Sequence, residues 1–252
     1  MTPAEYRKLF DLDGRVALVI GGASGIGLAA AEAMAAFGAR VVVGDIAPAG
    51  GDAIHVDVTS TASVDAAVDE TLKRHGRIDV LLTTPARNLR KRLADYSDDE
   101  FDRVIDLNLK GTFRAARAVA KPMMRQRSGS IILMSSMRAY SVEPGQSIYA
   151  STKAGIAQMT KGLATELAPH GIRVNALAPG IVETPLTRPI TSNPDWNRAY
   201  AARTALGRWA RADEMAGPIV FLASDASSYL TATVIKADAG WTEIDGRYTP
   251  PV

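Results

Sequence analysis

A short apolar segment that runs directly into a glycine-rich turn constrains the fold of this chain more than any other feature. Residues 15–20 (Arg-Val-Ala-Leu-Val-Ile) are rich in β-branched side chains, which is typical of a buried parallel strand. The turn Gly21-Gly-Ala-Ser-Gly-Ile-Gly27 follows, and an alanine-rich segment then leads to Gly38. Strand, glycine-rich turn and helix in this order are the context that a dinucleotide-binding fingerprint requires. Because glycines also make ordinary strand–helix turns, the motif alone leaves both interpretations open.

Each glycine of this turn has a predicted role if the segment binds a dinucleotide. Gly21 would permit the tight turn, Gly25 the close approach of the pyrophosphate, and Gly27 the close packing of helix on strand. Ser24 and Ile26 complete the turn, and the exposed N–H groups and dipole at the start of the helix would attract the phosphates.

Asp45 predicts which dinucleotide is bound. It ends the next predicted strand, eighteen residues after Gly27, where a carboxylate accepts hydrogen bonds from the adenosine ribose. A 2′-phosphate placed at ~4 Å from it would meet roughly 4 kcal/mol of repulsion per unit charge at an effective dielectric constant of 20. Ser24 supplies no compensating cation, so the sequence predicts NAD as the cofactor.

A second motif carries the chemistry. Tyr149 and Lys153 are four residues apart and would share one face of a helix, and Ser136 precedes the tyrosine by thirteen residues. An ammonium beside a phenol stabilises the phenolate, although lowering the phenol pKa from about 10 to ~7 requires roughly 4 kcal/mol. A serine hydroxyl at the same point can hold a substrate oxygen. Together the three residues predict a site that moves a proton to or from a carbinol or carbonyl oxygen.

With these motifs in place, residues 12–241 resemble the short-chain dehydrogenase/reductase family. They are similar both to its polyol and sugar dehydrogenases, such as gluconate 5-dehydrogenases, and to its 3-oxoacyl-acyl-carrier-protein reductases. The resemblance assigns the family's catalytic serine, tyrosine and lysine to Ser136, Tyr149 and Lys153. It also assigns to Asn108 the helix asparagine that holds a water in the proton relay.

The resemblance extends the predicted cofactor contacts beyond the glycine-rich turn. Asp57 is similar to the residue that meets the adenine amino group, and residues 179–184 resemble the loop that cradles the nicotinamide. Lys153 would also bind the nicotinamide ribose. The predicted cofactor residues are Gly21, Ser24, Gly25, Ile26, Gly27, Asp45, Asp57, Val58, Thr84, Pro85, Tyr149, Lys153, Pro179, Gly180, Ile181 and Thr184.

The chain departs from the family pattern at two coupled places. The family's Asn-Asn-Ala-Gly after the fourth strand is replaced by Thr-Thr-Pro-Ala at residues 83–86, and the threonine before the glycine-rich turn is replaced by Ile20. Proline removes an N–H group there, and alanine restricts φ more than glycine does. We expect the threonine side chains to replace the missing polar partners, with a slightly altered loop and intact catalysis.

The alternation of strand and helix patterns predicts an α/β fold. We expect one domain, residues 1–252, with a Rossmann-like, doubly wound parallel sheet of seven strands and helices on both faces. A long helix is predicted over residues 98–127, with a kink at Pro122. Only nine residues separate Gly44 from Ile54, fewer than a helical crossover needs. The helix after the second strand is therefore predicted to be shortened or absent, which leaves the adenine side of the cofactor site open.

Composition excludes several classes of function. The chain has no cysteine, which excludes disulfides and thiolate metal sites and suits a cytoplasmic enzyme. Its formal net charge of +2 is too small to suggest nucleic-acid binding. No apolar run approaches the ~18 residues of a membrane span, and the charged residues among the first thirteen argue against a signal peptide. The three histidines are dispersed, so no catalytic metal is predicted.

The substrate is the least constrained part of the prediction. Arg138, Glu143 and Gln146 lie between the predicted serine and tyrosine, and such side chains suit a polyol, sugar or sugar acid better than a steroid or acyl chain. We therefore expect a hydride transfer between NAD and a secondary alcohol or ketone of a polar small molecule. A reductase of apolar ketones or acyl thioesters is the alternative, and a catalytically weak NAD-binding scaffold or sensor is a remoter one.

The resemblance also implies an assembly. In this family, the long helix over residues 98–127 and the helix over residues 149–168 pack against copies of themselves, and a second contact joins the last strand and the helix before it. These contacts predict a homotetramer with dihedral symmetry.

Overall fold

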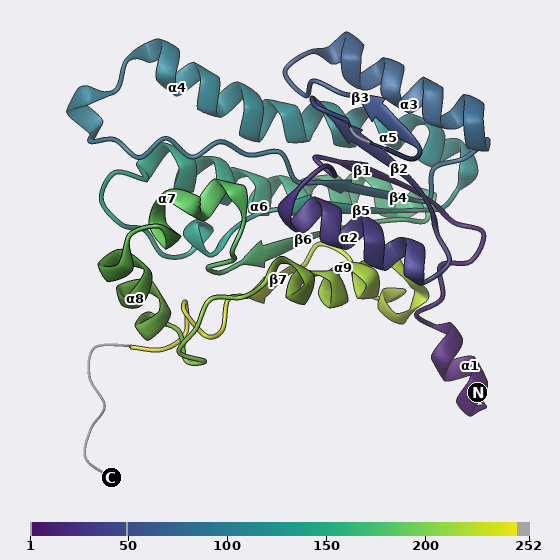
Figure 1. The fold of residues 1–252 in the computed structure, drawn as a ribbon. Helices are drawn as coiled ribbons and strands as arrows, with labels where there is room; N and C mark the ends of the chain where they lie inside the picture. The colour runs from purple at the N-terminus through teal and green to yellow at the C-terminus, as the bar shows by residue number, and fades with distance from the viewer. Residues whose placement is uncertain (1, 49, 246–252) are drawn as a thin grey trace.

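One sheet contains every strand in the part of the chain that the computed structural model describes, residues 2–48 and 50–245. All neighbouring strands pair in parallel, in the order β3–β2–β1–β4–β5–β6–β7 (Figure 1). This confirms the predicted doubly wound α/β fold. The strands are β1 (Val16–Ile20), β2 (Arg40–Asp45), β3 (Ala53–His55), β4 (Val80–Thr83), β5 (Gly129–Met134), β6 (Ile172–Pro179) and β7 (Val234–Ala237).

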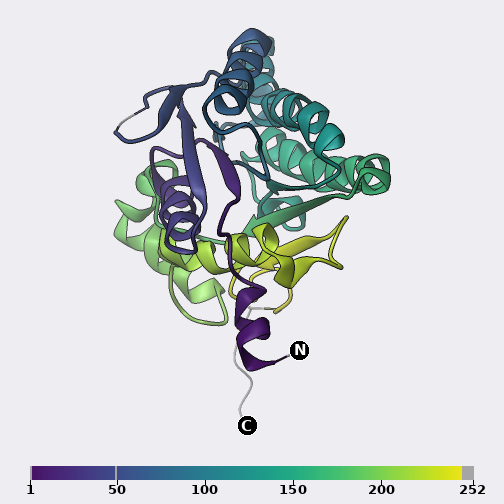
Figure 2. The same cartoon turned by 90° about the vertical axis from the view of Figure 1, so that its right-hand side faces the viewer.

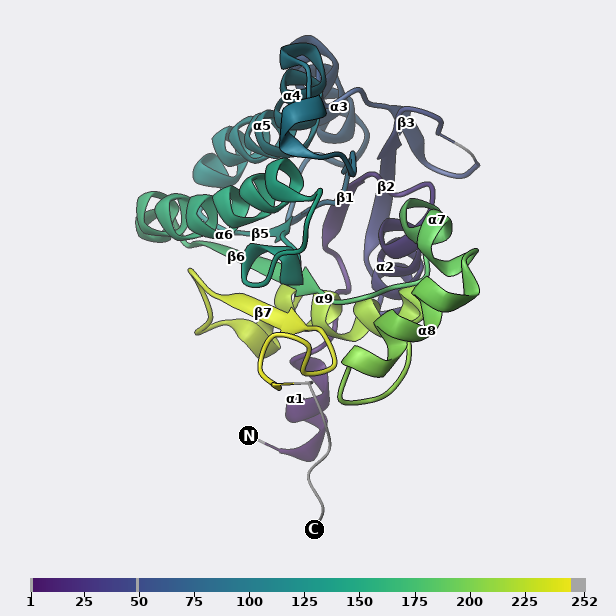
Figure 3. The same cartoon turned by 90° about the vertical axis from the view of Figure 1, so that its left-hand side faces the viewer.

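Helices cover both faces of this sheet. On one face lie α3 (Thr61–His75), α5 (Gly111–Gln126) and α6 (Ser147–Leu167), whereas α2 (Gly25–Ala36) and α9 (Ala216–Ala223) cover the other (Figures 2 and 3). The short helices α7 (Arg188–Thr191) and α8 (Pro194–Arg203) lie beyond the carboxyl ends of the strands, and α1 (Pro3–Lys8) extends away from the sheet (Figure 1).

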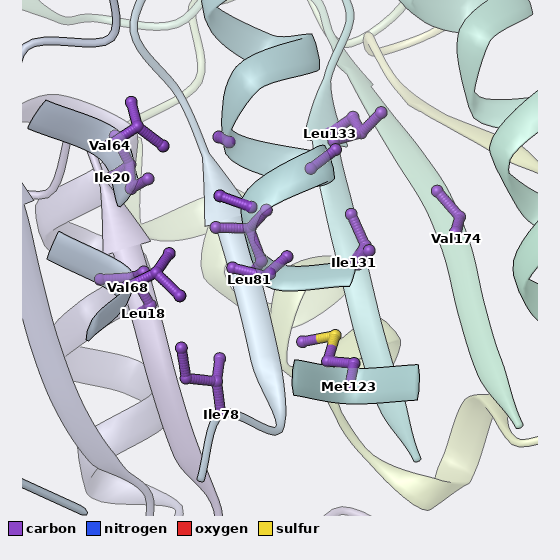
Figure 4. Close-up of a cluster of buried hydrophobic side chains, with 14 of the residues drawn as sticks. Leu18, Ile20, Val64, Val68, Ile78, Leu81, Met123, Ile131, Leu133 and Val174 are labelled. Atoms are coloured by element: carbon purple, nitrogen blue, oxygen red, sulfur yellow. The ribbon is translucent and has the colours of Figure 1, made fainter. Parts of the chain in front are cut away.

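Alternate residues of the central strands supply the two hydrophobic cores. Leu18, Leu81 and Ile131 face the side of α3, α5 and α6, as the close-up shows (Figure 4). Val19 and Leu82, their neighbours in sequence, face α2 and α9 instead. All five side chains are fully buried, and each such burial stabilises the fold by roughly 2 kcal/mol. The strands are therefore apolar on both faces, as the runs of β-branched residues predict.

No helix occurs among the described residues between β2 and β3, which confirms the prediction made from the short spacing. The connection is instead tied to the end of α3. Asp52 pairs there with Arg74, and its second carboxylate oxygen lies 2.6 Å from Nε2 of His75. Hydrogen bonds and charges from these two residues lower the pKa of Asp52, although burial opposes them as the largest single effect.

The predicted helix over residues 98–127 is not one continuous α-helix. It consists of α4 (Asp98–Ile105), a π-helical segment at residues 106–110, and α5. Pro122 lies buried inside α5, which continues through it to Gln126. Ser97 caps α4 by accepting a hydrogen bond from the Glu100 N–H, as its position in the sequence predicts.

Candidate active site

The predicted site residues gather at the carboxyl edge of the sheet, where α7 and α8 also lie (Figure 3). A cavity of about 430 Å³ opens there between the ends of β1, β2, β4, β5 and β6. Ligands of open parallel sheets bind at this edge. The predicted residues that line the cavity are Gly21, Ser24, Gly25, Ile26, Gly27, Asp45, Asp57, Val58, Thr84, Pro85, Ser136, Tyr149, Lys153, Pro179, Gly180 and Thr184.

The glycine-rich turn is packed so closely that a side chain is excluded at Gly21 and at Gly27. Gly21 has a φ of 84°, and a Cβ atom there would overlap the Thr84 hydroxyl. A Cβ atom at Gly27 would overlap the carbonyl oxygen of Gly21. Ser24 precedes α2 and makes no side-chain hydrogen bond to its first turn, so the N–H groups of that turn keep their capacity for an anion. This cradle fits a dinucleotide pyrophosphate.

Thr84 makes the compensating contact that the coupled departures predict. Its hydroxyl donates to the carbonyl oxygen of Gly21 at 3.0 Å and lies 3.3 Å from that of Ile20. The Thr84 N–H also donates to the Ile20 carbonyl at 2.9 Å. Ile20 lacks the threonine hydroxyl that the family has before the glycine-rich turn. The Thr84 hydroxyl contacts the turn in its place, from the other side.

Two aspartates that line the cavity are held in place by local hydrogen bonds. Asp45 accepts from the Ala23 N–H at 3.0 Å with one carboxylate oxygen and from the Ala47 N–H at 3.1 Å with the other. Asp57 accepts from the hydroxyl and the N–H of Thr59, and these bonds lower the pKa of Asp57. The groups that hold the two carboxylates thus lie in the segments that follow β1, β2 and β3.

Tyr149 and Lys153 lie on the buried face of α6, one turn apart. The Lys153 ammonium is 5.7 Å from the centroid of the Tyr149 ring and donates to the carbonyl of Met134 at 2.8 Å. Ser136 follows β5, and its hydroxyl accepts from the Arg138 N–H at 3.1 Å. We use the term candidate catalytic group for Ser136, Tyr149, Lys153 and Asn108.

Burial is the largest effect on the ionisation of Tyr149 and Lys153. Burial, the largest effect, raises the pKa of Tyr149, while a hydrogen bond with Ser136 and the positive charge of Arg138 lower it. The Lys153 ammonium is directed at the Met134 carbonyl, and the lowering of the phenol pKa by Lys153 stays a prediction. Burial also lowers the pKa of Lys153 to about 8.

Asn108 sits in the π-helical segment and is fully buried. Its side-chain amide accepts from the Arg87 N–H at 2.8 Å, donates to the Arg87 carbonyl at 2.9 Å, and donates to the Thr152 hydroxyl at 3.2 Å. The amide thus joins the segment after β4 to α6. Its backbone carbonyl accepts from the Thr112 hydroxyl at 2.7 Å.

Comparison with known proteins agrees with this geometry. Residues 21–242 match a family described as Enoyl-(Acyl carrier protein) reductase. The chain belongs to the short-chain dehydrogenase/reductase family. It is 40% identical over 244 residues to a 3-oxoacyl-(acyl-carrier-protein) reductase of Thermotoga maritima, covering 91% of this chain and 98% of that protein.

Two further relatives show how widely this family varies. A 3-alpha-(or 20-beta)-hydroxysteroid dehydrogenase of Mycobacterium tuberculosis is 40% identical over 240 residues, covering 91% of this chain and 90% of that protein. A gluconate 5-dehydrogenase from Burkholderia cenocepacia, solved with NADP and tartrate, is 34% identical with a TM-score of 0.89. The match covers 94% of this chain and 98% of that one. The chain is therefore an oxidoreductase whose substrate class these relatives leave undecided.

The three predicted substrate residues lie together but outside the lining of the cavity that holds the glycine-rich turn. Oε1 of Glu143 accepts from Nε2 of Gln146 at 2.6 Å and lies 3.1 Å from Nη2 of Arg138. Arg90, from the segment after β4, and Tyr200, from α8, hydrogen-bond to the same oxygen. We call these five residues the loop cluster. They join three connections: the segment after β4, the segment between β5 and α6, and the segment after β6 that contains α8.

Ile181 is the predicted cofactor residue that the structure places elsewhere. Its side chain is buried with Met137, Tyr200, Trp209 and Trp241 in an aromatic cluster beneath α8. The next residue, Val182, lines the cavity instead.

Sequence reasoning missed several residues that line the cavity. Those after Thr184 could have been predicted, because they continue the loop over residues 179–184. The missed residues are Ile46, Val56, Ala86, Leu107, Met134, Ser135, Val182, Pro185, Leu186 and Thr187.

Two further findings bear on other classes of function. None of the helices in residues 2–48 and 50–245 has the length and hydropathy of a membrane-spanning segment. Within the same ranges, no group of three or more histidine or acidic side chains is placed to hold a metal ion.

Proposed function

We propose that this protein transfers a hydride between NAD and a secondary alcohol or ketone of a polar small molecule, such as a sugar, polyol or sugar acid. One observation carries the proposal. Ser136, Tyr149 and Lys153 line the same cavity as the glycine-rich turn and Asp45, so a cofactor and a carbinol can meet there. When bound, the nicotinamide supplies the acceptor or donor of the hydride.

The side chains of the candidate catalytic group then handle the proton. In oxidation, the Tyr149 phenolate takes the carbinol proton while the Ser136 hydroxyl holds the substrate oxygen. In reduction, the same phenol gives the proton back. Lys153 would hold the nicotinamide ribose, and the Asn108 backbone carbonyl would hold the relay water.

NADH formation during a screen of polyols and sugar acids tests this function. We expect NADH absorbance to rise with at least one of these substrates and not in the Tyr149→Phe variant. A panel with no turnover in either direction would favour the scaffold or sensor alternative.

A reductase of acyl thioesters or apolar ketones is the second candidate. The 40% identity to an acyl-carrier-protein reductase and to a hydroxysteroid dehydrogenase favours it, as do Leu107, Met134 and Leu186 in the cavity wall. Including a 3-oxoacyl thioester and a steroid ketone in the screen separates the two. A higher kcat/KM with either of these than with any polyol or sugar acid would replace the polar substrate.

The cofactor preference follows from the carboxylate of Asp45. Both of its oxygens accept hydrogen bonds from backbone N–H groups, which holds the negative charge at the end of β2, where the resemblance places the adenosine ribose. We expect strong preference for NAD(H), relaxed by Asp45→Ser. The NADP of the Burkholderia structure belongs to that protein, and an equal or better kcat/KM with NADP(H) here would overturn the assignment.

We also propose a homotetramer, on the resemblance to the family. Light scattering at micromolar concentration should give about four times the chain mass of 26.7 kDa. A stable monomer would contradict the proposal, and a dimer would leave only one of the two family contacts.

A further inference from the structure

A second cavity opens at the amino edge of the sheet, away from the candidate active site. It has a volume of about 640 Å³ and lies beside the amino ends of β1, β4, β5 and β6, which are consecutive in the sheet. The six residues of β5 separate the two edges by roughly 20 Å. No described residue lines both cavities. A ligand at the amino edge would therefore occupy a site distinct from the one proposed for the cofactor.

Five charged side chains line this second cavity, which we call the amino-edge cavity. Three are guanidinium groups: Arg15 directly precedes β1, Arg77 lies three residues before β4, and Arg173 is the second residue of β6. The other two are the carboxylates of Asp79 and Asp225. The described lining thus carries three positive and two negative charges, which leaves one positive charge in excess.

The excess charge belongs to Arg173. Arg77 binds Asp79 through Nε at 2.8 Å and through Nη2 at 2.6 Å. Nη2 of Arg15 lies 2.6 Å from a carboxylate oxygen of Asp225. In the part of the chain that the structure describes, no carboxylate forms an ion pair with Arg173. Its positive charge is therefore balanced by dipoles alone.

Arg173 is held in place but keeps donors for a ligand. Its Nη1 donates to the Ser227 hydroxyl at 2.8 Å, and its Nη2 donates to the carbonyls of Leu222 and Ser224 at 3.0 and 3.1 Å. A guanidinium has five N–H groups, so the Nε–H and one Nη1–H have no acceptor among the described residues. Burial, the largest effect, and the positive charge of Arg15 both lower the pKa of Arg173. A bound anion would offset this repulsion.

The neutral part of the wall suits a small organic anion. The hydroxyls of Ser128 and Ser228 line the cavity and make no hydrogen bond to a described residue. Ile172 and Leu230 add apolar surface, and the volume falls in the range of ~300–1,000 Å³ that is usual for small-molecule sites. The cavity therefore has room for more than a bare ion.

We propose that the amino-edge cavity binds a small organic anion through a carboxylate or phosphate group, with Arg173 as its first partner and Arg15 as its second. Oxygens of both groups accept hydrogen bonds from guanidinium N–H groups, and such charge-assisted bonds are about twice as strong as neutral ones. Asp225 competes with the ligand for Arg15. Asp79 competes less, because Arg77 and a backbone N–H already occupy its carboxylate.

Calorimetric titration with inorganic phosphate and with acetate, at neutral pH and constant ionic strength, tests this proposal. The probe that binds more tightly shows whether the site takes a phosphate or a carboxylate. Ser128 is an exposed residue of the lining, so Ser128→Glu adds a competing carboxylate and Ser128→Gln adds a neutral side chain of the same size. The Kd of the tighter probe should rise about tenfold or more in Ser128→Glu, the effect of one lost hydrogen bond to a charged group. It should change little in Ser128→Gln.

Two further variants change the charges that are already present. Asp225→Asn releases Arg15 from its carboxylate and should lower the Kd several-fold, and the 61% exposure of the Asp225 side chain makes this change safe for the fold. Arg173→Gln removes the first partner and should abolish binding. Circular dichroism shows whether each variant is folded.

The variants also separate this cavity from the glycine-rich turn, the other place where phosphate can bind. The turn lies at the opposite edge of the sheet, so binding there should be equal in all of these proteins. The same Kd in the unchanged chain, Ser128→Glu and Asp225→Asn would therefore overturn the proposal, as would no heat of binding from either probe. If Arg173→Gln does not fold, the Ser128 pair and Asp225→Asn decide without it.

Discussion

The candidate catalytic group and the loop cluster lie at the same edge of the sheet but are held in different ways. Asn108, Ser136 and Lys153 are fixed largely by hydrogen bonds to backbone atoms of β5, the segment after β4, and the turn after β5. In the loop cluster, side chains from three separate connections converge on the carboxylate of Glu143.

This difference indicates a division of labour. Backbone atoms of a buried sheet do not move when one side chain changes, so they suit groups whose geometry the chemistry depends on. Side chains from loops can be exchanged singly, so they suit a surface that varies with the substrate. Variants in the first region should therefore change turnover, whereas variants in the second should change substrate binding and stability.

The largest expected effect is on turnover in Tyr149→Phe. The change removes the proton carrier but little volume, so kcat should fall by at least ~100-fold, a typical contribution of general-base catalysis. NAD binding should barely change, which fluorescence titration would show. Near-normal turnover would show that Tyr149 is not the proton carrier. The candidate catalytic group would then no longer differ from the loop cluster in its effect on turnover.

Lys153→Met should make the fold more stable while removing activity. The pKa of Lys153 is lowered from 10.5 to about 8, so the folded state disfavours the charged form at neutral pH. This penalty is fully present below pH 8 and disappears as the pH rises to 10.5, where the unfolded chain also loses its proton. A pKa lowered from 10.5 to about 8 corresponds to about 3 kcal/mol of destabilisation of the folded state at neutral pH. The variant regains this free energy, less the contribution of the hydrogen bond to the Met134 carbonyl that it loses.

Thermal unfolding at neutral pH measures this gain, and the advantage of the methionine variant should shrink above pH 8. If the Lys153→Met variant had a lower Tm than the unchanged chain, the Lys153 ammonium would have stabilising contacts in addition to the Met134 carbonyl.

Tyr200→Phe should separate the loop cluster from the chemistry. Its buried hydroxyl donates to Glu143 and accepts from Arg90 and Arg138, each at 3.1 Å. Its loss leaves these charged partners underpaired and should cost roughly 1–2 kcal/mol of unfolding free energy. We expect the substrate KM to rise several-fold and kcat to change little. A drop in kcat without a change in KM would place Tyr200 with the catalytic group instead.

The smallest effect is expected for Thr84→Val, which removes only the hydroxyl bonded to the Gly21 carbonyl. A neutral hydrogen bond contributes about 1 kcal/mol, so the Kd for NAD should rise by roughly fivefold. Thr84→Ser keeps the hydroxyl and should bind NAD normally. Equal affinities in all three proteins would show that the strand, and not this contact, holds the turn.

Local spacing made the shared placement of Tyr149, Lys153 and the glycine-rich turn at one cavity predictable, whereas Asn108 was assigned by the resemblance to the family. The four-residue separation of Tyr149 and Lys153 places both on one helix face wherever the helix packs, and Asp45 is positioned by the strand that ends there. Counting residues was also enough to predict the missing helix between β2 and β3, because chain length limits a crossover whatever its sequence.

The loop cluster and the facing of Ile181 depend on distant contacts that spacing does not encode. Arg90 and Tyr200 meet Glu143 across 53 and 57 residues of sequence, so its partners could not be inferred from the segment that holds it. Ile181 follows Pro179 and Gly180 at the cavity, but the aromatic rings beneath α8 bury its side chain. Packing between segments that are distant in sequence determines both the partners of Glu143 and the burial of the Ile181 side chain.

The π-helical segment at residues 106–110 makes this part of the chain intolerant of a change in length. Each residue turns an α-helix by about 100°, and a π-helical turn accommodates one extra residue. Deleting Leu109 would let α4 and α5 join as one regular helix, and would swing the side chains on α4 around its axis. Asn108 would then lose Arg87 and Thr152 together. Insertions and deletions should therefore accumulate in the connections around the site, but not in this turn.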